Sequence, residues 1–138
     1  MQVVADTSTV VSGLMWSGAP RQVLDVARTG RIRLFTSVAL LAELDDVLRR
    51  DKFVRQLARA GTKPRRLLAQ YAALAHVVEP ETIVPVVLAD ADDDAVLACA
   101  LAAHADVIVT GDRHLLQLNS YRNITIVPAN ELLRRLSP

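Results

Sequence analysis

The sequence VIVTGD at residues 107–112 decides the fold class of this 138-residue chain. Three apolar β-branched residues and a threonine indicate a short strand that is buried on both faces, and the glycine after them indicates a tight turn ending on Asp112. The same order occurs at residues 3–6, where Val-Val-Ala leads to Asp6. Short strands of this kind are typical of a parallel sheet with helices on both sides.

Working outward, three further apolar runs predict strands, at 32–36, 76–78 and 124–127. Signals for the start of a helix lie after several of the predicted strands, at Pro20, Ser37 and Pro128. Two more helices, over 51–60 and from Pro64 onward, predict a helical hairpin inserted between strands. The regular alternation predicts a single doubly wound α/β domain over residues 1–138.

The segments between these elements are less regular. A turn is expected after Asp6, a loop-like stretch at 13–18, and an extended loop at 81–89, which contains Pro85. Asp92 or Asp93 is expected to cap the next helix.

The composition excludes several classes of protein. Hydrophobic residues make up 51% of the chain, which is too many for a disordered protein. No apolar run reaches the ~18 residues of a membrane helix, and the first residues lack the basic region of a secretory signal. The single cysteine excludes an internal disulfide framework and a cysteine-rich zinc site. We therefore expect a cytoplasmic protein.

The net charge of +1 conceals a separation of signs. Residues 47–70 contain eight basic residues against one acid, whereas acids gather at 90–94. Separated charge of this kind favours a polyanionic partner such as RNA, although a basic hairpin could equally be a solvated surface. The candidate RNA-binding residues are Arg49, Arg50, Lys52, Arg55 and Arg113.

Four acids from separate segments are expected to meet at one edge of the sheet. Asp6 and Asp112 follow strands, Asp94 (or its neighbour Asp93) opens a helix, and Glu43 lies beside the apolar stripe of another helix. Two carboxylates ~4 Å apart repel by about 4 kcal/mol at an effective dielectric near ~20, so protonation or a cation must relieve them. Oxygen ligands favour Mg²⁺ or Mn²⁺, as one or two ions.

Each of these residues also has an ordinary structural explanation. An aspartate at a helix start commonly caps it, and a lone helical glutamate is commonly solvated. The expected convergence, and not any single residue, favours a metal site. Thr7, Ser8 and Thr110 could hydrogen-bond the ligands or simply close turns, and His114 lies near the site.

Five motifs together resemble those of the PIN (PilT N-terminal) domain. They are Asp6-Thr7-Ser8, Glu43 within LLAEL at 40–44, DDDAVLA at 92–98, VTGDR at 109–113 and YRNI at 121–124. The sequence is most similar to the stand-alone bacterial and archaeal type, which is often assigned as the toxin of a toxin–antitoxin pair. The family often has asparagine where Ser8 stands.

The resemblance implies a Mg²⁺- or Mn²⁺-dependent ribonuclease with a five-stranded parallel sheet. It places the acidic residues of the family at Asp6, Glu43, Asp94 and Asp112, with Asp93 as a neighbouring possibility. It also implies a homodimer held inactive by a small antitoxin.

The leading hypothesis is a single-domain endoribonuclease. In it, Asp6, Asp94 and Asp112 bind the metal, and Glu43 binds it or orients the attacking water. One alternative is a catalytically silent RNA- or partner-binding PIN module. Another is a phosphoryl-accepting switch domain, but residues 76–79 do not supply the required aspartate after a central third strand.

Overall fold

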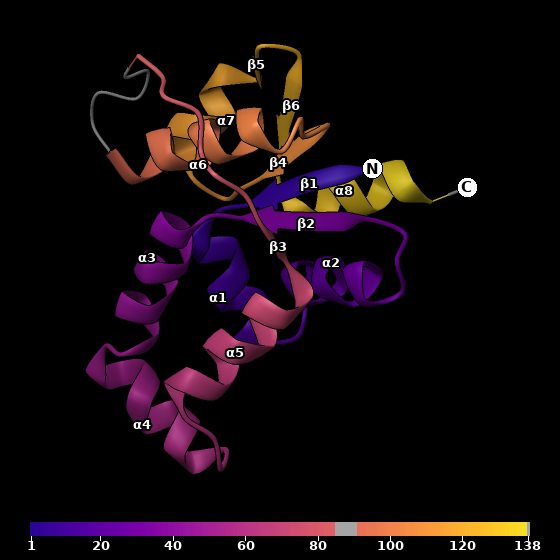
Figure 1. Ribbon diagram of the computed structural model, residues 1–138. Coiled ribbons are helices and arrows are strands. Elements are labelled where there is room, and N and C mark those ends of the chain that lie inside the picture. Colours follow the sequence, from indigo (N-terminus) through magenta and orange to yellow (C-terminus); the bar gives the residue numbers. More distant parts are fainter. Residues whose placement is uncertain (85–90, 138) are drawn as a thin grey trace.

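The computed structural model describes residues 1–84 and 91–137, which form a sheet with helices on both faces (Figure 1). The sheet has six strands in the order β3-β2-β1-β4-β6-β5. The first five strands in this order pair in parallel, and β5 pairs with β6 antiparallel. The strands are β1 (Gln2–Ala5), β2 (Arg33–Thr36), β3 (His76–Val77), β4 (Val107–Val109), β5 (Ser120–Tyr121) and β6 (Ile124–Val127).

The central strands are buried on both faces, as the sequence predicts. Side chains alternate between the faces of a strand, so neighbouring residues belong to different hydrophobic cores. Val3 and Val107 belong to one core, whereas Val4 and Ile108 belong to the other. All four are at most 4% exposed.

The helices divide between the two faces, with α6 and α7 on one side of the sheet and α1, α2 and α5 on the other (Figure 1). Apolar residues of α1, α2, α3, α4, α5 and α8 share the core that contains Val3. The helices are α1 (Thr7–Met15), α2 (Ala19–Arg28), α3 (Val38–Leu48), α4 (Asp51–Arg59), α5 (Pro64–Leu74), α6 (Ala91–Ala102), α7 (Arg113–Leu118) and α8 (Ala129–Leu136).

The predicted helical hairpin is confirmed as α4 and α5, which extend away from the sheet (Figure 1). Gly61 lies between them with a φ of 76°, a conformation that favours glycine. Phe53 and Leu57 of α4, with Leu67 and Tyr71 of α5, turn inward and are buried. The basic residues of the hairpin are therefore left on its outer surfaces.

Several local predictions were wrong. Residues 7–15 form α1, not a turn and a loop, because Asp6 caps the helix and Val10, Val11 and Leu14 are buried. Neither Asp92 nor Asp93 caps α6, since the helix begins at residue 91 and both lie in its first turn. The edge strand β5 is an addition to the predicted five. Residues 81–84 are neither helix nor strand, and 85–89 and Asp90 lie outside the described residues.

Gly13 allows α1 and α2 to pack closely. A Cβ atom there would lie 2.9 Å from the backbone oxygen of Pro20 and 2.8 Å from Cδ1 of Leu24. We predict that Gly13→Ala destabilises the fold by about 1–3 kcal/mol despite the better helix propensity of alanine, because the Pro20 backbone cannot move freely. Urea unfolding would measure this, with Gly111→Ala as the control, since a Cβ there meets nothing within 4 Å. Equal stability of the two variants would contradict the prediction.

Cys99 is fully buried in the core beneath α6. Burial raises the pKa of its thiol to about 12, so the thiol stays protonated at neutral pH.

Across the described residues, every helix is too short or too polar to cross a bilayer.

Candidate functional site

The candidate site lies where the direction of chain winding reverses. From β1 the sheet runs to β2 and β3 on one side and to β4 and β6 on the other. In open α/β sheets, ligands bind beyond the carboxyl ends of the strands at this reversal. Asp6 follows β1 and Thr110 follows β4, and the backbone N–H of Asp6 donates to the carbonyl of Val109. The fold therefore places these two side chains side by side.

Asp6 is a buried carboxylate that is fixed by its neighbours. It is 5% exposed and stands at the N-cap of α1, where its Oδ1 accepts from the backbone N–H of Thr9 at 3.0 Å. The hydroxyl of Ser8 lies 3.3 Å from both carboxylate oxygens, and the hydroxyl of Thr110 donates to Oδ2 at 2.5 Å. Together these contacts fix the orientation of the Asp6 carboxylate.

Thr110 connects Asp6 to Asp112. The Thr110 hydroxyl donates a hydrogen bond to Asp6, and its oxygen also accepts a hydrogen bond from the backbone N–H of Asp112 at 2.9 Å. Asp112 in turn caps α7, because its Oδ2 accepts from the backbone N–H of Leu115 at 3.0 Å. The VTGD motif thus closes a turn that aims a second carboxylate at the same edge of the sheet.

Within residues 1–84 and 91–137, Asp93, Asp112 and His114 form a cluster that could hold a cation. One ligand atom from each residue lies within 4.8 Å of the others. Asp93 is buried, Asp112 is partly buried and His114 is exposed, so the cluster opens toward solvent on the side of His114. The three residues come from α6 and from the turn that begins α7.

The electrostatics of Asp112 reflect this crowding. Partial burial opposes its ionisation, but hydrogen bonds from the Asp93 side chain and from the backbone N–H of Leu115 outweigh that effect. The charge of His114 acts in the same direction, so the net result is a lowered pKa for Asp112. Two carboxyl groups can share a hydrogen bond only if a proton lies between them. A bound cation would relieve the repulsion between the two carboxylates in place of this shared proton.

The donor set fits a divalent cation. Buried and half-buried carboxylates are suitable ligands for Mg²⁺ and Mn²⁺, and an imidazole is a better ligand for a transition-metal ion than for Mg²⁺. Asp6 is not a member of this cluster, but Thr110 links its carboxylate to the backbone N–H of Asp112.

The remaining predicted acids lie on nearby elements. Glu43 is half-buried on α3, which packs against both α1 and α6. Asp94 is half-buried in the first turn of α6, next to Asp93. The cation cluster among the described residues contains Asp93 in place of Asp94.

The three auxiliary polar residues differ in their contacts. Ser8 and Thr110 hydrogen-bond Asp6, as described above. The Thr7 hydroxyl is buried without a hydrogen-bond partner in the described part of the chain, and it lines a small internal cavity with Tyr71. The contacts therefore support Ser8 and Thr110, and not Thr7, as residues that order the site.

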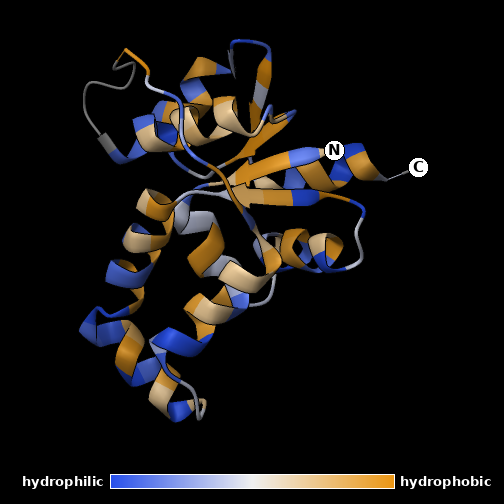
Figure 2. Cartoon of the chain, viewed as in Figure 1, coloured by the Kyte–Doolittle hydropathy of each residue, from blue (hydrophilic) through white to orange (hydrophobic). Residues whose placement is uncertain are grey.

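The candidate RNA-binding residues are all exposed, and Figure 2 shows hydrophilic residues along the basic hairpin. Arg113 is the first residue of α7 and follows Asp112 directly. Arg49 pairs with Asp45 at 2.9 Å, and the Lys52 ammonium lies 4.8 Å from the centre of the Phe53 ring. Arg50 is the N-cap residue of α4, and Arg55 lies within this helix.

Sequence reasoning gave too little weight to His114. Its position two residues after Asp112 is visible in the sequence, and a capped helix start brings such residues to the same end of the helix. That spacing is the signal that could have identified it.

Comparison with known proteins adds a family and a related structure. A family model described as PIN domain matches residues 2–114. The structure of the PIN domain of T. brucei RRP44 is similar, with 17% sequence identity and a TM-score of 0.47. The match covers 96% of this chain and 79% of the other. No curated protein matches the sequence.

Proposed function

Because the chain belongs to the PIN domain family, whose members are generally metal-dependent nucleases, we propose that it is an endoribonuclease that uses a divalent cation. The observation that carries this proposal is the cluster of Asp93, Asp112 and His114 at the reversal point of the sheet, with Asp6 held beside it. Carboxylates are concentrated at this site, whereas the helical hairpin of α4 and α5 is basic.

In the proposed site, Asp6, Asp93 and Asp112 hold the cation, and His114 completes the set. Once bound, a divalent ion supplies the Lewis acid that activates water and stabilises phosphodiester oxygens during hydrolysis. Glu43 orients the attacking water or contributes a further ligand. Ser8 and Thr110 orient the Asp6 carboxylate. Arg113 contacts a phosphate of the substrate.

The direct test is cleavage of end-labelled single-stranded RNA by the purified chain. We expect cutting with Mn²⁺ or Mg²⁺, loss of cutting in EDTA, and recovery when Mn²⁺ is added in excess. Persistent cutting in EDTA would contradict the metal dependence. RNA binding without cutting under any divalent ion would instead support the alternative of a catalytically silent binding module.

His114 gives a prediction that does not depend on activity. We expect pulsed EPR of the Mn²⁺-loaded protein to show modulation from a ¹⁴N nucleus, because an imidazole nitrogen of His114 lies within 4.8 Å of an oxygen of each of the two carboxylates. His114→Ala should remove this modulation and weaken Mn²⁺ binding by about tenfold. His76→Ala, at an exposed histidine on β3, is the matched control. Absence of ¹⁴N modulation in the unmodified protein would exclude His114 as a ligand.

The basic hairpin gives a second prediction. We propose that Arg49, Arg50, Lys52 and Arg55 contact RNA phosphates. Neutralising two of them, in Lys52→Gln/Arg55→Gln, should weaken RNA binding. It should also reduce the magnitude of the slope of log K against log salt concentration by about one to two, because fewer counterions are released. Arg33→Gln, at the amino-terminal end of β2 and thus at the opposite edge of the sheet, should leave both unchanged. An unchanged salt slope in the double variant would show that the hairpin is only a solvated surface.

We further propose a cytoplasmic toxin that forms a homodimer and is held inactive by an antitoxin protein. The support is the resemblance of the motifs to stand-alone PIN toxins. Co-purification of the chain from its native host, with mass spectrometry of bound proteins and sizing of the complex, tests the homodimer and the antitoxin partner.

The switch-domain alternative finds no support. Such a domain needs its acceptor aspartate after a central strand, but β3 is an edge strand of two residues, followed by Val78 and Glu79.

A further inference from the structure

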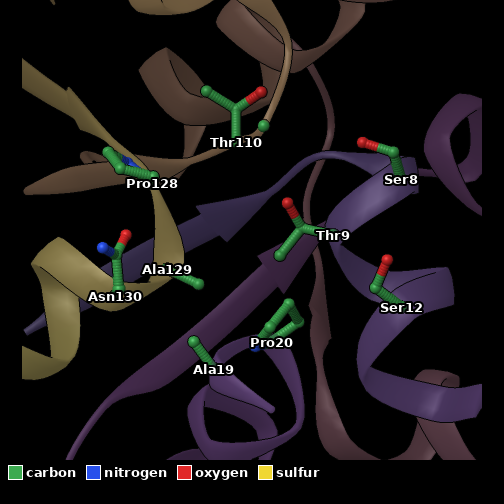
Figure 3. A pocket seen from close by; sticks show the side chains of 10 residues that line it. Ser8, Thr9, Ser12, Ala19, Pro20, Thr110, Pro128, Ala129 and Asn130 are labelled. Atoms are coloured by element: carbon green, nitrogen blue, oxygen red, sulfur yellow. The ribbon is translucent and has the colours of Figure 1, made fainter. Parts of the chain in front are cut away.

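A pocket of about 280 Å³ lies beside Asp6, and none of the proposed cation ligands lines it. It is enclosed by the beginnings of α1, α2 and α8 and by the turn after β4 (Figure 3). The chain segments after β1, β4 and β6 all contribute to it, so it lies at the same edge of the sheet as Asp6.

The pocket and the cation site share two residues. Ser8 and Thr110 line the pocket, and the hydroxyls of both contact the Asp6 carboxylate. A molecule in the pocket would therefore lie directly next to the group that holds the cation. In an enzyme that cleaves a polymer, the substrate residue next to the cleaved bond is expected to occupy such a position.

The chemistry of the pocket is neutral. None of the residues that line it carries a charged side chain. Pro20 and Pro128 supply apolar surface, whereas Thr9, Ser12 and Asn130 supply uncharged donors and acceptors. Figure 3 shows Asn130 on one side of the pocket and Ser12 on the other, with Pro20 between them.

We propose that this pocket binds the nucleobase of a nucleotide adjacent to the scissile phosphate, an inference that rests on the proposed ribonuclease function. A nucleobase is flat, uncharged and edged with hydrogen-bonding groups, which matches apolar walls with neutral polar side chains. Phosphate recognition favours arginine or lysine, and the pocket has neither. Pro20 also removes one backbone N–H from the first turn of α2, so that helix start is a poorer anion site.

The size of the pocket limits what it can hold. Pockets for drug-sized molecules begin near ~300 Å³, so this one suits a single base and not a longer stretch of RNA. Because Ser12 and Asn130 can read the edge of a base, they are expected to give the enzyme a preference for one or two of the four bases.

The test measures binding by NMR on the full chain without divalent ions. The probes are the four nucleoside 5′-monophosphates, with ribose 5-phosphate as the probe that lacks a base. We expect at least one nucleotide to shift the amide signals of Gly111 and Ala129, and to bind about tenfold more tightly than ribose 5-phosphate, the equivalent of one or two net hydrogen bonds. Equal binding of ribose 5-phosphate, shifts that map elsewhere, or no binding at millimolar concentration would overturn the proposal.

Variants assign the binding to the pocket. Ser12→Ala and Asn130→Ala should each weaken nucleotide binding by about three- to tenfold, the loss of one neutral hydrogen bond. Ser17→Ala, at an exposed serine between α1 and α2 that does not line the pocket, should bind like the unmodified chain. If the two pocket variants also bind normally, the assignment is wrong.

This experiment separates the two proposals. Nucleotide binding without any RNA cleavage would contradict the ribonuclease function and leave the pocket assignment in place. RNA cleavage without nucleotide binding at the pocket would do the reverse.

Discussion

Replacing Asp6 with asparagine should reduce metal-dependent RNA cleavage by about a hundredfold or more, which is the usual effect of removing one electrostatic partner of a transition state. The substitution removes the charge but keeps the shape. Asparagine is as good an N-cap as aspartate, so its oxygen can still accept the Thr9 N–H and hold the start of α1. The Thr110 hydroxyl can rotate and accept a hydrogen bond from the N–H of the new amide.

We expect Asp6→Asn to lose RNA cleavage without losing thermal stability. Removing one negative charge from a group of carboxylates relieves repulsion when no cation is present, so the melting temperature should be equal or higher. Asp46→Asn, at an exposed aspartate on α3, is the matched control and should cut RNA normally. Cleavage by Asp6→Asn at the normal rate would remove Asp6 from the site.

The second large effect is expected at Asp93. Asp93 is buried and belongs to the cluster with Asp112 and His114. Asp93→Asn should therefore weaken Mn²⁺ binding by at least about 10- to 100-fold, since even residues behind the ligands have effects of that size. Titration calorimetry with Mn²⁺ measures it directly.

Asp94→Asn is the natural comparison, because it removes the same charge one residue along the same helix. We expect less than about a threefold effect on Mn²⁺ affinity, as for a charge that acts through a largely aqueous medium. The opposite ranking of the two variants would make Asp94 the ligand, as the family resemblance implies.

The sequence could not choose between these neighbours for a geometric reason. Successive residues of a helix point about 100° apart, so the residue that faces the site depends on where the helix begins. Three consecutive aspartates offer no pattern that fixes this starting point. The structure begins α6 at residue 91, and packing of its apolar residues on the sheet then turns Asp93 inward.

Other parts of the fold were predictable because several signals agreed. Apolar runs ending in an acid identified the central strands, and a proline and a glycine identified the hairpin of α4 and α5. In contrast, α1 contains β-branched residues and small polar residues whose local preference is not helical. It is a helix because Asp6 caps it and the core covers one side, and the contacts with the core are not visible in a short window of sequence.

The sheet lies between the two hydrophobic cores, and the site draws on both. Asp6 is the N-cap residue of α1, and α1 packs into one core. Asp93 lies on α6, and α6 packs into the other core. A local opening of either layer would separate these carboxylates before the whole chain unfolds. On mild heating, the affinity for the cation should therefore fall at a lower temperature than the main calorimetric unfolding transition. A saturating concentration of the ion should stabilise the contact between the two layers and raise the temperature of both the local opening and the global unfolding.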